Sequence, residues 1–272
     1  MKKDYIEKYH FNNKGWIWGT IWPALLYLGL SFFIGIIGAI IAAIYASIKG
    51  IDYMDIAYSG NLNLFLNIIV QIISLSIYLP IYLINKKKYY PKPKQKPNIK
   101  IILLSICFVF LILTPTDMLL TYISNHFDIS SSYYELTQEL ITDASPIISI
   151  ITVILLGPIT EELMIRGLSL NKALSRKKVI TAIIISSIIF GIIHLNLLQG
   201  IFAFIVGITL AIVFIKTKSI IPCIIIHIIN NLIAYITMYT TNNTTLIINI
   251  ITIVISIIPA ILFIKEKEIE YE

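Results

Sequence analysis

The chain has 272 residues, of which 57% are hydrophobic and 13% are charged, and its net charge is +6. A soluble domain of this composition would lack the polar surface needed to cover its core. Long uncharged runs alternate with short lysine-rich clusters, which is typical of membrane spans whose flanking lysines face the cytoplasm and the lipid headgroups. We therefore expect a multi-pass protein of the cell membrane, with the lipid bilayer as a partner and no binding of nucleic acid.

Eight segments are apolar over a length close to the roughly 20 residues that a helix needs to cross a bilayer. They are residues 16–48, 63–84, 101–124, 146–170, 179–195, 199–215, 219–239 and 246–264. The first run is too long for one helix perpendicular to the membrane, so it forms either one helix or two. The sequence thus predicts an all-α fold, a polytopic membrane helix bundle with about eight transmembrane helices.

The connections between the predicted spans alternate between basic and non-basic. The basic ones are residues 86–100, 172–178, 216–218 and 265–267. Because lysine and arginine are enriched in cytoplasmic loops, this alternation predicts that both termini are cytoplasmic. The Pro- and Lys-rich segment 86–100 is predicted to be an extended cytoplasmic linker between N-terminal transmembrane helices (1–85) and a six-helix core (101–272).

Ionisable side chains inside a span cost about 2.5–3.5 kcal/mol each, so those in the fourth span call for an explanation. Glu162 lies four residues before Arg166, so the two share a helix face and can form an ion pair. Glu161 points about 100° away and has no partner on its own helix. Pro158 is predicted to kink the helix just before the two glutamates. A purely structural ion network explains Glu162 and Arg166 well but explains Glu161 poorly.

Two histidines also lie in predicted spans. Glu161 lies 16 residues before Lys177 and His194 lies 17 after it, so in an antiparallel hairpin the two are predicted to face each other at one depth. His227 and Asn231 are four residues apart and share a helix face, with Asn230 as the competing choice. The alternative is that these polar groups only hold helices together.

These residue types suggest two chemistries. A carboxylate and an imidazole can activate a water molecule, and a second histidine and an amide can donate to the oxygen of an attacked carbonyl. This predicts hydrolysis of an amide, with His227 and Asn231 as the oxyanion donors. Two histidines and one glutamate are also a ligand set for catalytic zinc, although the compact H-E-x-x-H motif is missing. The metal-free and the zinc version both remain open at this point.

Three short motifs in this region resemble those of a known family. EELMIR (161–166) fits E-E-x-x-x-R, FGIIH (190–194) fits F-x-x-x-H, and HIINN (227–231) fits H-x-x-x-N. In this order, within residues 145–240, the set resembles the CPBP family, which includes CAAX prenyl protease type 2 and its bacteriocin-processing and Abi relatives. The resemblance implies an intramembrane endopeptidase of the glutamic type with an eight-helix bundle.

The resemblance also implies roles for individual residues. The residues at the family's catalytic positions are Glu161, His194, His227 and Asn231. Those at supporting positions are Glu162, Arg166 and Phe190. No cofactor or metal is expected, with zinc as the alternative, and the substrate is expected to be a membrane-associated or lipidated peptide or protein. A proton-coupled transporter or a non-catalytic bacteriocin-immunity protein is the alternative function, because buried Glu and His side chains also form proton relays.

Overall fold

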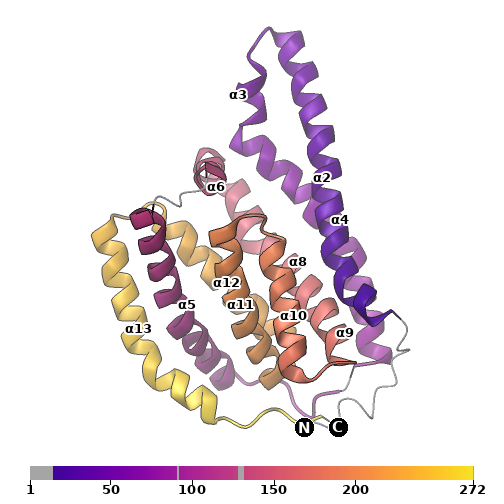
Figure 1. The fold of residues 1–272 in the computed structure, drawn as a ribbon, viewed down its shortest axis with the longest axis vertical. Coiled ribbons are helices and arrows are strands. Elements are labelled where there is room, and N and C mark those ends of the chain that lie inside the picture. The colour runs from indigo at the N-terminus through magenta and orange to yellow at the C-terminus, as the bar shows by residue number, and fades with distance from the viewer. Residues whose placement is uncertain (1–14, 91, 128–131, 272) are drawn as a thin grey trace.

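A computed structural model describes residues 15–90, 92–127 and 132–271. Within these residues the regular structure is helical, apart from one antiparallel bridge between Pro93 and Tyr271. The helices are α2 (Trp16–Lys49), α3 (Tyr53–Ala57), α4 (Gly60–Lys88), α5 (Ile99–Phe127), α6 (Ser132–Asp143), α7 (Pro146–Ser149), η1 (Ile150–Leu156), α8 (Gly157–Glu162), η2 (Leu163–Leu170), α9 (Asn171–Leu174), α10 (Val179–Ile192), α11 (Leu197–Thr217), α12 (Ile220–Thr237) and α13 (Asn242–Lys265). The predicted all-α class is confirmed (Figure 1).

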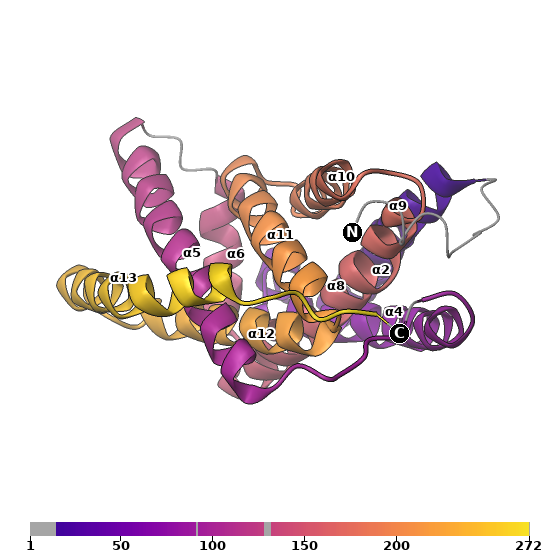
Figure 2. The ribbon, with the colours of Figure 1, turned by 90° about the horizontal axis from the view of Figure 1, so that it is seen from below.

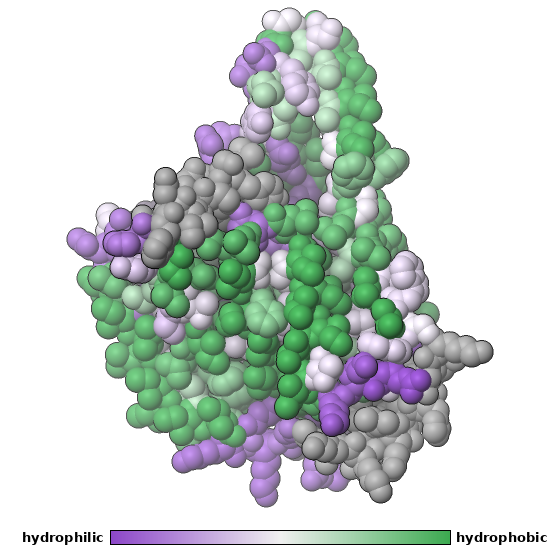
Figure 3. Space-filling model, in the orientation of Figure 1, coloured by the Kyte–Doolittle hydropathy of each residue, from purple (hydrophilic) through white to green (hydrophobic). Residues whose placement is uncertain are grey.

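Seven helices in the described part of the chain are long and apolar enough to cross a membrane. They are α2, α4, residues Ile99–Ser124 of α5, the continuous helical stretch Pro146–Leu174, α11, α12 and α13. Figure 3 shows an apolar surface over most of the bundle that continues upward along α2, with hydrophilic residues gathered at the lower end. The protein is a multi-pass integral membrane protein, as predicted, and the cell membrane is the expected location.

The predicted fifth span is helical but shorter than expected. Helix α10 has 14 residues, about 21 Å at 1.5 Å per residue, against roughly 30 Å for the hydrocarbon core. It ends at Ile192 because the chain turns at Leu195, whose backbone is left-handed (φ 54°). The predicted end at residue 195 was therefore too late. Helix α10 still runs from the lower end of the bundle toward the upper one (Figure 1).

The long N-terminal apolar run forms one continuous helix. Helix α2 has 34 residues and contains Pro23, so it extends about 51 Å, well beyond the hydrocarbon core of a bilayer. Its upper part, with α3 and the start of α4, projects beyond the other helices (Figure 1). Lower down, the Tyr78 hydroxyl of α4 donates to the Pro23 carbonyl at 2.6 Å. Both helices pack there against the stretch that carries the predicted site.

The basic connections meet at one end of the bundle. There the C-terminal tail leaves α13 and crosses under the other helices toward α4 (Figure 2). The Lys94 amide donates to the Glu270 carbonyl at 2.9 Å, and the side chains of these two residues form an ion pair. The linker predicted over residues 86–100 therefore pairs with the tail, whereas the membrane side on which this end lies stays a prediction.

Glycines bring α10 and α11 close together. A Cβ on Gly191 would lie 2.7 Å from the Gly200 carbonyl oxygen, and a Cβ on Gly207 would lie 2.8 Å from the Cβ of Ser187. Any larger residue would push the two helices apart. The close neighbours of Gly191 therefore lie on α11. This packing positions the end of α10, where His194 follows.

Candidate active site

The helix that carries the two glutamates is distorted on both sides of them. Helix α8 holds Glu161 and Glu162, and π-helical segments η1 and η2 precede and follow it. In a π-helix each N–H bonds to the carbonyl five residues back, and such segments are frequent at functional sites. Pro158, which has no N–H to donate, is the second residue of α8, just after η1. The disruption expected near Pro158 therefore takes a π-helical form.

Amide side chains from two other helices bond to the carbonyls of η1. Asn231 Nδ2 on α12 donates to the Val153 carbonyl at 2.9 Å, and Gln71 Nε2 on α4 donates to the Thr152 carbonyl at 3.2 Å. Val153 lies five residues before Pro158, so a π-helical bond from Pro158 to it cannot form. Asn231 supplies that missing donor. The distorted turn is thus held from both sides of the bundle.

Glu162 and Arg166 form a fully buried ion pair. Arg166 Nη1 donates to Glu162 Oε1 at 2.8 Å, and both side chains are 0% exposed. Arg166 Nη2 also donates to the carbonyls of Val206 and Gly207 on α11, at 3.2 and 3.1 Å. The pair predicted from the four-residue spacing is confirmed, and Arg166 ties it to a neighbouring helix.

His227 lies between the two glutamates. Its Nδ1 is 2.9 Å from Glu162 Oε1, and its Nε2 is 3.6 Å from Glu161 Oε2. The Glu161 side chain is 18% exposed, whereas that of Glu162 is completely buried. The two adjacent carboxylates therefore differ. Glu162 is tied to Arg166 and His227, while Glu161 contacts His227 more loosely and reaches the surface of the site.

The Phe190 ring contacts both histidine rings. Its ring meets those of His194 and His227 edge-on, with centroids 5.0 and 5.9 Å apart, and the Arg166 guanidinium lies 5.1 Å from its centroid. His194 Nδ1 bonds to the Phe190 carbonyl at 2.8 Å, which leaves its Nε2 for another partner. Within the described residues no ion pair joins His194 to Glu161; the histidine beside Glu161 is His227.

The zinc version predicted as an alternative can be compared with this geometry. The Nδ1 atoms of His194 and His227 bond to a carbonyl and a carboxylate respectively, which is also how metal-ligating histidines are held, so these bonds do not separate the two versions. The described residues contain no group of three His, Cys, Asp or Glu side chains placed to hold a metal ion. Glu161, His194 and His227 are therefore not gathered as a zinc ligand set here.

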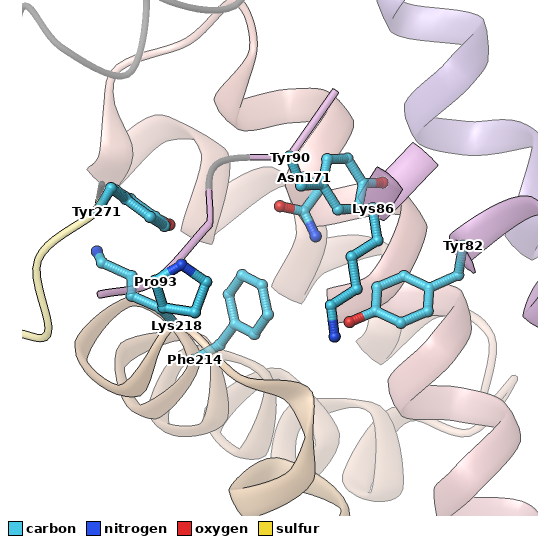
Figure 4. A pocket seen from close by; sticks show the side chains of 8 residues that line it. All are labelled: Tyr82, Lys86, Tyr90, Pro93, Asn171, Phe214, Lys218 and Tyr271. Atoms are coloured by element: carbon cyan, nitrogen blue, oxygen red, sulfur yellow. The ribbon is translucent and has the colours of Figure 1, made fainter. Parts of the chain in front are cut away.

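One polar residue at this site was not predicted. Gln71 on α4 is 3% exposed and reaches η1. The sequence offers one signal for it, an amide in an otherwise apolar span. A separate small cleft at the basic end contains none of the predicted site residues (Figure 4). It is lined by Tyr82, Lys86, Tyr90, Pro93, Asn171, Phe214, Lys218 and Tyr271.

Together, the fold and this cluster define a polytopic membrane protein with paired carboxylates and histidines inside its helix bundle. Residues 143–233 match the family model described as "Type II CAAX prenyl endopeptidase Rce1-like". This stretch includes all three motifs, so the match confirms the resemblance to the CAAX protease family and supports an intramembrane peptidase. It covers about a third of the chain. No curated protein and no solved structure matches the chain.

Proposed function

We propose that the protein hydrolyses a peptide bond of a membrane-associated or lipidated peptide or protein, with Glu161 as the general base. The observation that carries this proposal is the difference between the two adjacent glutamates. Glu162 is 0% exposed and bonded to Arg166 and His227, whereas Glu161 is 18% exposed and 3.6 Å from His227. A general base must reach both a water molecule and the substrate, and the partial exposure of Glu161 supports this role.

In the proposed reaction Glu161 takes a proton from water while the water oxygen bonds to the carbonyl carbon of the scissile peptide. The carbonyl becomes an oxyanion, and its charge requires donors that are already in place. The C–N bond then breaks, and the proton held by Glu161 passes to the leaving nitrogen. The products are a carboxylic acid and an amine.

His227 and Asn231 are proposed as the oxyanion donors. Asn231 Nδ2 has two hydrogens, of which one bonds to the Val153 carbonyl, so the other is available. Since His227 Nδ1 donates to Glu162, its Nε2 can donate only when the ring is an imidazolium. In that state the charges of His227 and Arg166 balance those of the two glutamates. His194, with Nε2 unengaged by the Phe190 carbonyl, is proposed to orient the water or to share the proton.

The substrate class follows from the location of the cluster. Glu161, His227 and Asn231 lie in spans of a multi-pass bundle, so a peptide must enter through the membrane or at its surface. A prenylated peptide of the CAAX type is the first candidate, because the matched family model bears that name.

Substitution of Glu161 tests this proposal. Purified protein in liposomes is incubated with an internally quenched, farnesylated peptide that ends in a CAAX motif. We expect Glu161→Gln to lower kcat by about 10²–10⁴-fold, the usual contribution of general acid–base catalysis. Asp117→Asn, a carboxylate in α5 outside the cluster, is the control and should cleave at the wild-type rate. Wild-type cleavage by Glu161→Gln, at normal protein abundance, would rule the proposal out.

Metal removal separates the metal-free from the zinc-dependent version of the same chemistry. We expect dialysis against a strong chelator to leave kcat unchanged, because Glu161, His194 and His227 are not gathered as ligands. Elemental analysis of the active protein is the matching measurement. Loss of cleavage on chelation, restored by a stoichiometric amount of Zn²⁺, would contradict the metal-free version while leaving the peptidase itself in place.

A further inference from the structure

Asn230 continues the buried face of α12 toward the candidate active site. Ile226 and His227 are 0% and 5% exposed, and Asn230 lies four and three residues after them, so the three share a face of the helix. The Asn230 side chain is only partly buried. Its Nδ2 donates to the Oδ1 of Asn231, the proposed oxyanion donor, at 3.3 Å. Asn230 therefore lies beside the position proposed for the scissile peptide.

The amide of Asn230 has hydrogen-bonding capacity that the protein does not use. An asparagine amide has two donor hydrogens and one oxygen that accepts. One hydrogen bonds to Asn231, and among the described residues none donates to Asn230 Oδ1. Helix α12 is long and apolar enough to cross a membrane, where a polar group without partners is costly. A donor and an acceptor thus remain side by side next to the site.

A peptide substrate carries the groups that match this amide. Each peptide unit has one N–H and one C=O, and inside a bilayer both need partners from the protein because water is scarce there. The Oδ1 of Asn230 fits a substrate N–H, and its second Nδ2 hydrogen fits a substrate C=O. Successive residues of an extended chain lie about 3.3 Å apart. With the scissile carbonyl at Asn231, the peptide unit within reach of Asn230 is therefore a neighbouring one.

We propose that Asn230 binds the main chain of the substrate at a peptide unit next to the scissile bond. This inference rests on the proposed function of Glu161 and Asn231. Because the contact is made to main-chain atoms, it recognises a peptide as a class and does not select its side chains. The contact is the same before and during the reaction, so it stabilises the bound substrate and the transition state equally.

Substitution of Asn230 tests this role through the kinetic parameter that changes. Asn230→Leu replaces the amide with an apolar side chain of similar size. In the liposome assay with the farnesylated quenched peptide, we expect KM to rise about tenfold with kcat nearly unchanged, as for an interaction made equally in both states. A fall in kcat at constant KM would overturn the inference, because it would mean that Asn230 only orients Asn231.

Asn249 provides the matched control. It is also an asparagine within an apolar helix, but it lies on α13, which packs against α5. Asn249→Leu is the same chemical change away from the site, so it should leave both KM and kcat at the wild-type values. An equal rise of KM in Asn249→Leu would overturn the inference, since the effect would then not depend on the site.

Ester substrates test whether the partner of Asn230 is the main chain. An ester in place of a peptide unit removes the N–H donor, and it is placed before or after the scissile bond, which stays an amide. With the wild type, one of the two esters should raise KM about tenfold. With Asn230→Leu the same ester should cause no further rise. An equal rise in both proteins, or no rise with either ester in the wild type, would overturn the inference.

The outcomes also distinguish this inference from the proposed function. An inactive Glu161→Gln beside a wild-type KM in Asn230→Leu overturns the role of Asn230 alone. A fully active Glu161→Gln overturns the role of Glu161, whereas an ester effect that disappears in Asn230→Leu would still support the main-chain contact. If Asn230→Leu is poorly folded by size-exclusion chromatography, the smaller Asn230→Ala takes its place in both assays.

Discussion

Acid–base pairs occur in two very different regions of this protein. At the basic end Lys94 pairs with Glu270, and the two side chains are 56% and 74% exposed. Inside the bundle Arg166 pairs with Glu162, and both are 0% exposed. Exposed pairs contribute little because solvent screens them, whereas removing one member of a buried pair costs about 3–5 kcal/mol. The comparison teaches that the solvent exposure of an ion pair determines how much stability is lost when the pair is broken.

The buried pair also does more than neutralise charge. Arg166 bonds to two carbonyls of α11 and lies against the Phe190 ring, and Glu162 orients the His227 imidazole. Each of these contacts positions a residue of the proposed active site. The pair at the basic end, by contrast, joins the linker to the tail and contacts none of the site residues.

Breaking the buried pair should have the larger effect. Arg166→Met leaves the Glu162 carboxylate without its cation, so we expect the free energy of unfolding to fall by about 3–5 kcal/mol. Thermal unfolding in detergent, with membrane abundance as a second readout, measures this loss. Cleavage should fall as well, because Phe190 loses the guanidinium beside its ring and Glu162, which holds His227, loses its partner.

The double variant Glu162→Gln, Arg166→Met checks the reason for this loss. It removes both charges, so it should be clearly more stable than Arg166→Met alone, since a lone buried charge is the main cost. Equal instability of the single and double variants would show instead that the bonds from Arg166 to α11 dominate.

The local features of the site could be predicted from the sequence, because helix spacing determines them. The four-residue spacing of Glu162 and Arg166 predicted their ion pair, and it also separated Glu162 from Glu161. The all-α class and the positions of the spans followed from the apolar runs. Of the eight predicted spans, the segment at α10 differs, since the left-handed turn at Leu195 ends that helix early.

Contacts between distant segments could not be predicted in the same way. Gly191 and Gly200 bring α10 against α11, and His227 from α12 lies beside Glu161, whereas the predicted placement of His194 opposite Glu161 stays a prediction. Gln71 lies 81 residues before the carbonyl to which it donates, and a single buried amide in an apolar run carries no sign of its partner. The π-helical segments depend on these same contacts and were missed for the same reason.

The exposed pair at the basic end provides the smallest expected effect and a test by pH. The bond from Lys94 lowers the pKa of the Glu270 carboxyl below its usual value of 4.5. A lowered pKa in the folded state means that the contact stabilises the tail above about pH 4.5 and that this contribution is lost as the pH falls through the lower folded pKa. Glu270→Gln should therefore loosen the tail at pH 7 and make no difference near pH 2.

Spin labels at Lys96 and Lys267 can follow this change as a distance distribution. At pH 7 the distribution should be broader in Glu270→Gln than in the wild type, and the two should converge on acidification. Salt of about 1 M, which screens exposed charges beyond roughly 3 Å, should broaden the wild-type distribution in the same direction. Thermal unfolding at pH 7 should not change measurably, since exposed pairs contribute little. A large loss of stability in Glu270→Gln would contradict the comparison. It would mean that this exposed pair stabilises the protein as much as the buried pair of Glu162 and Arg166.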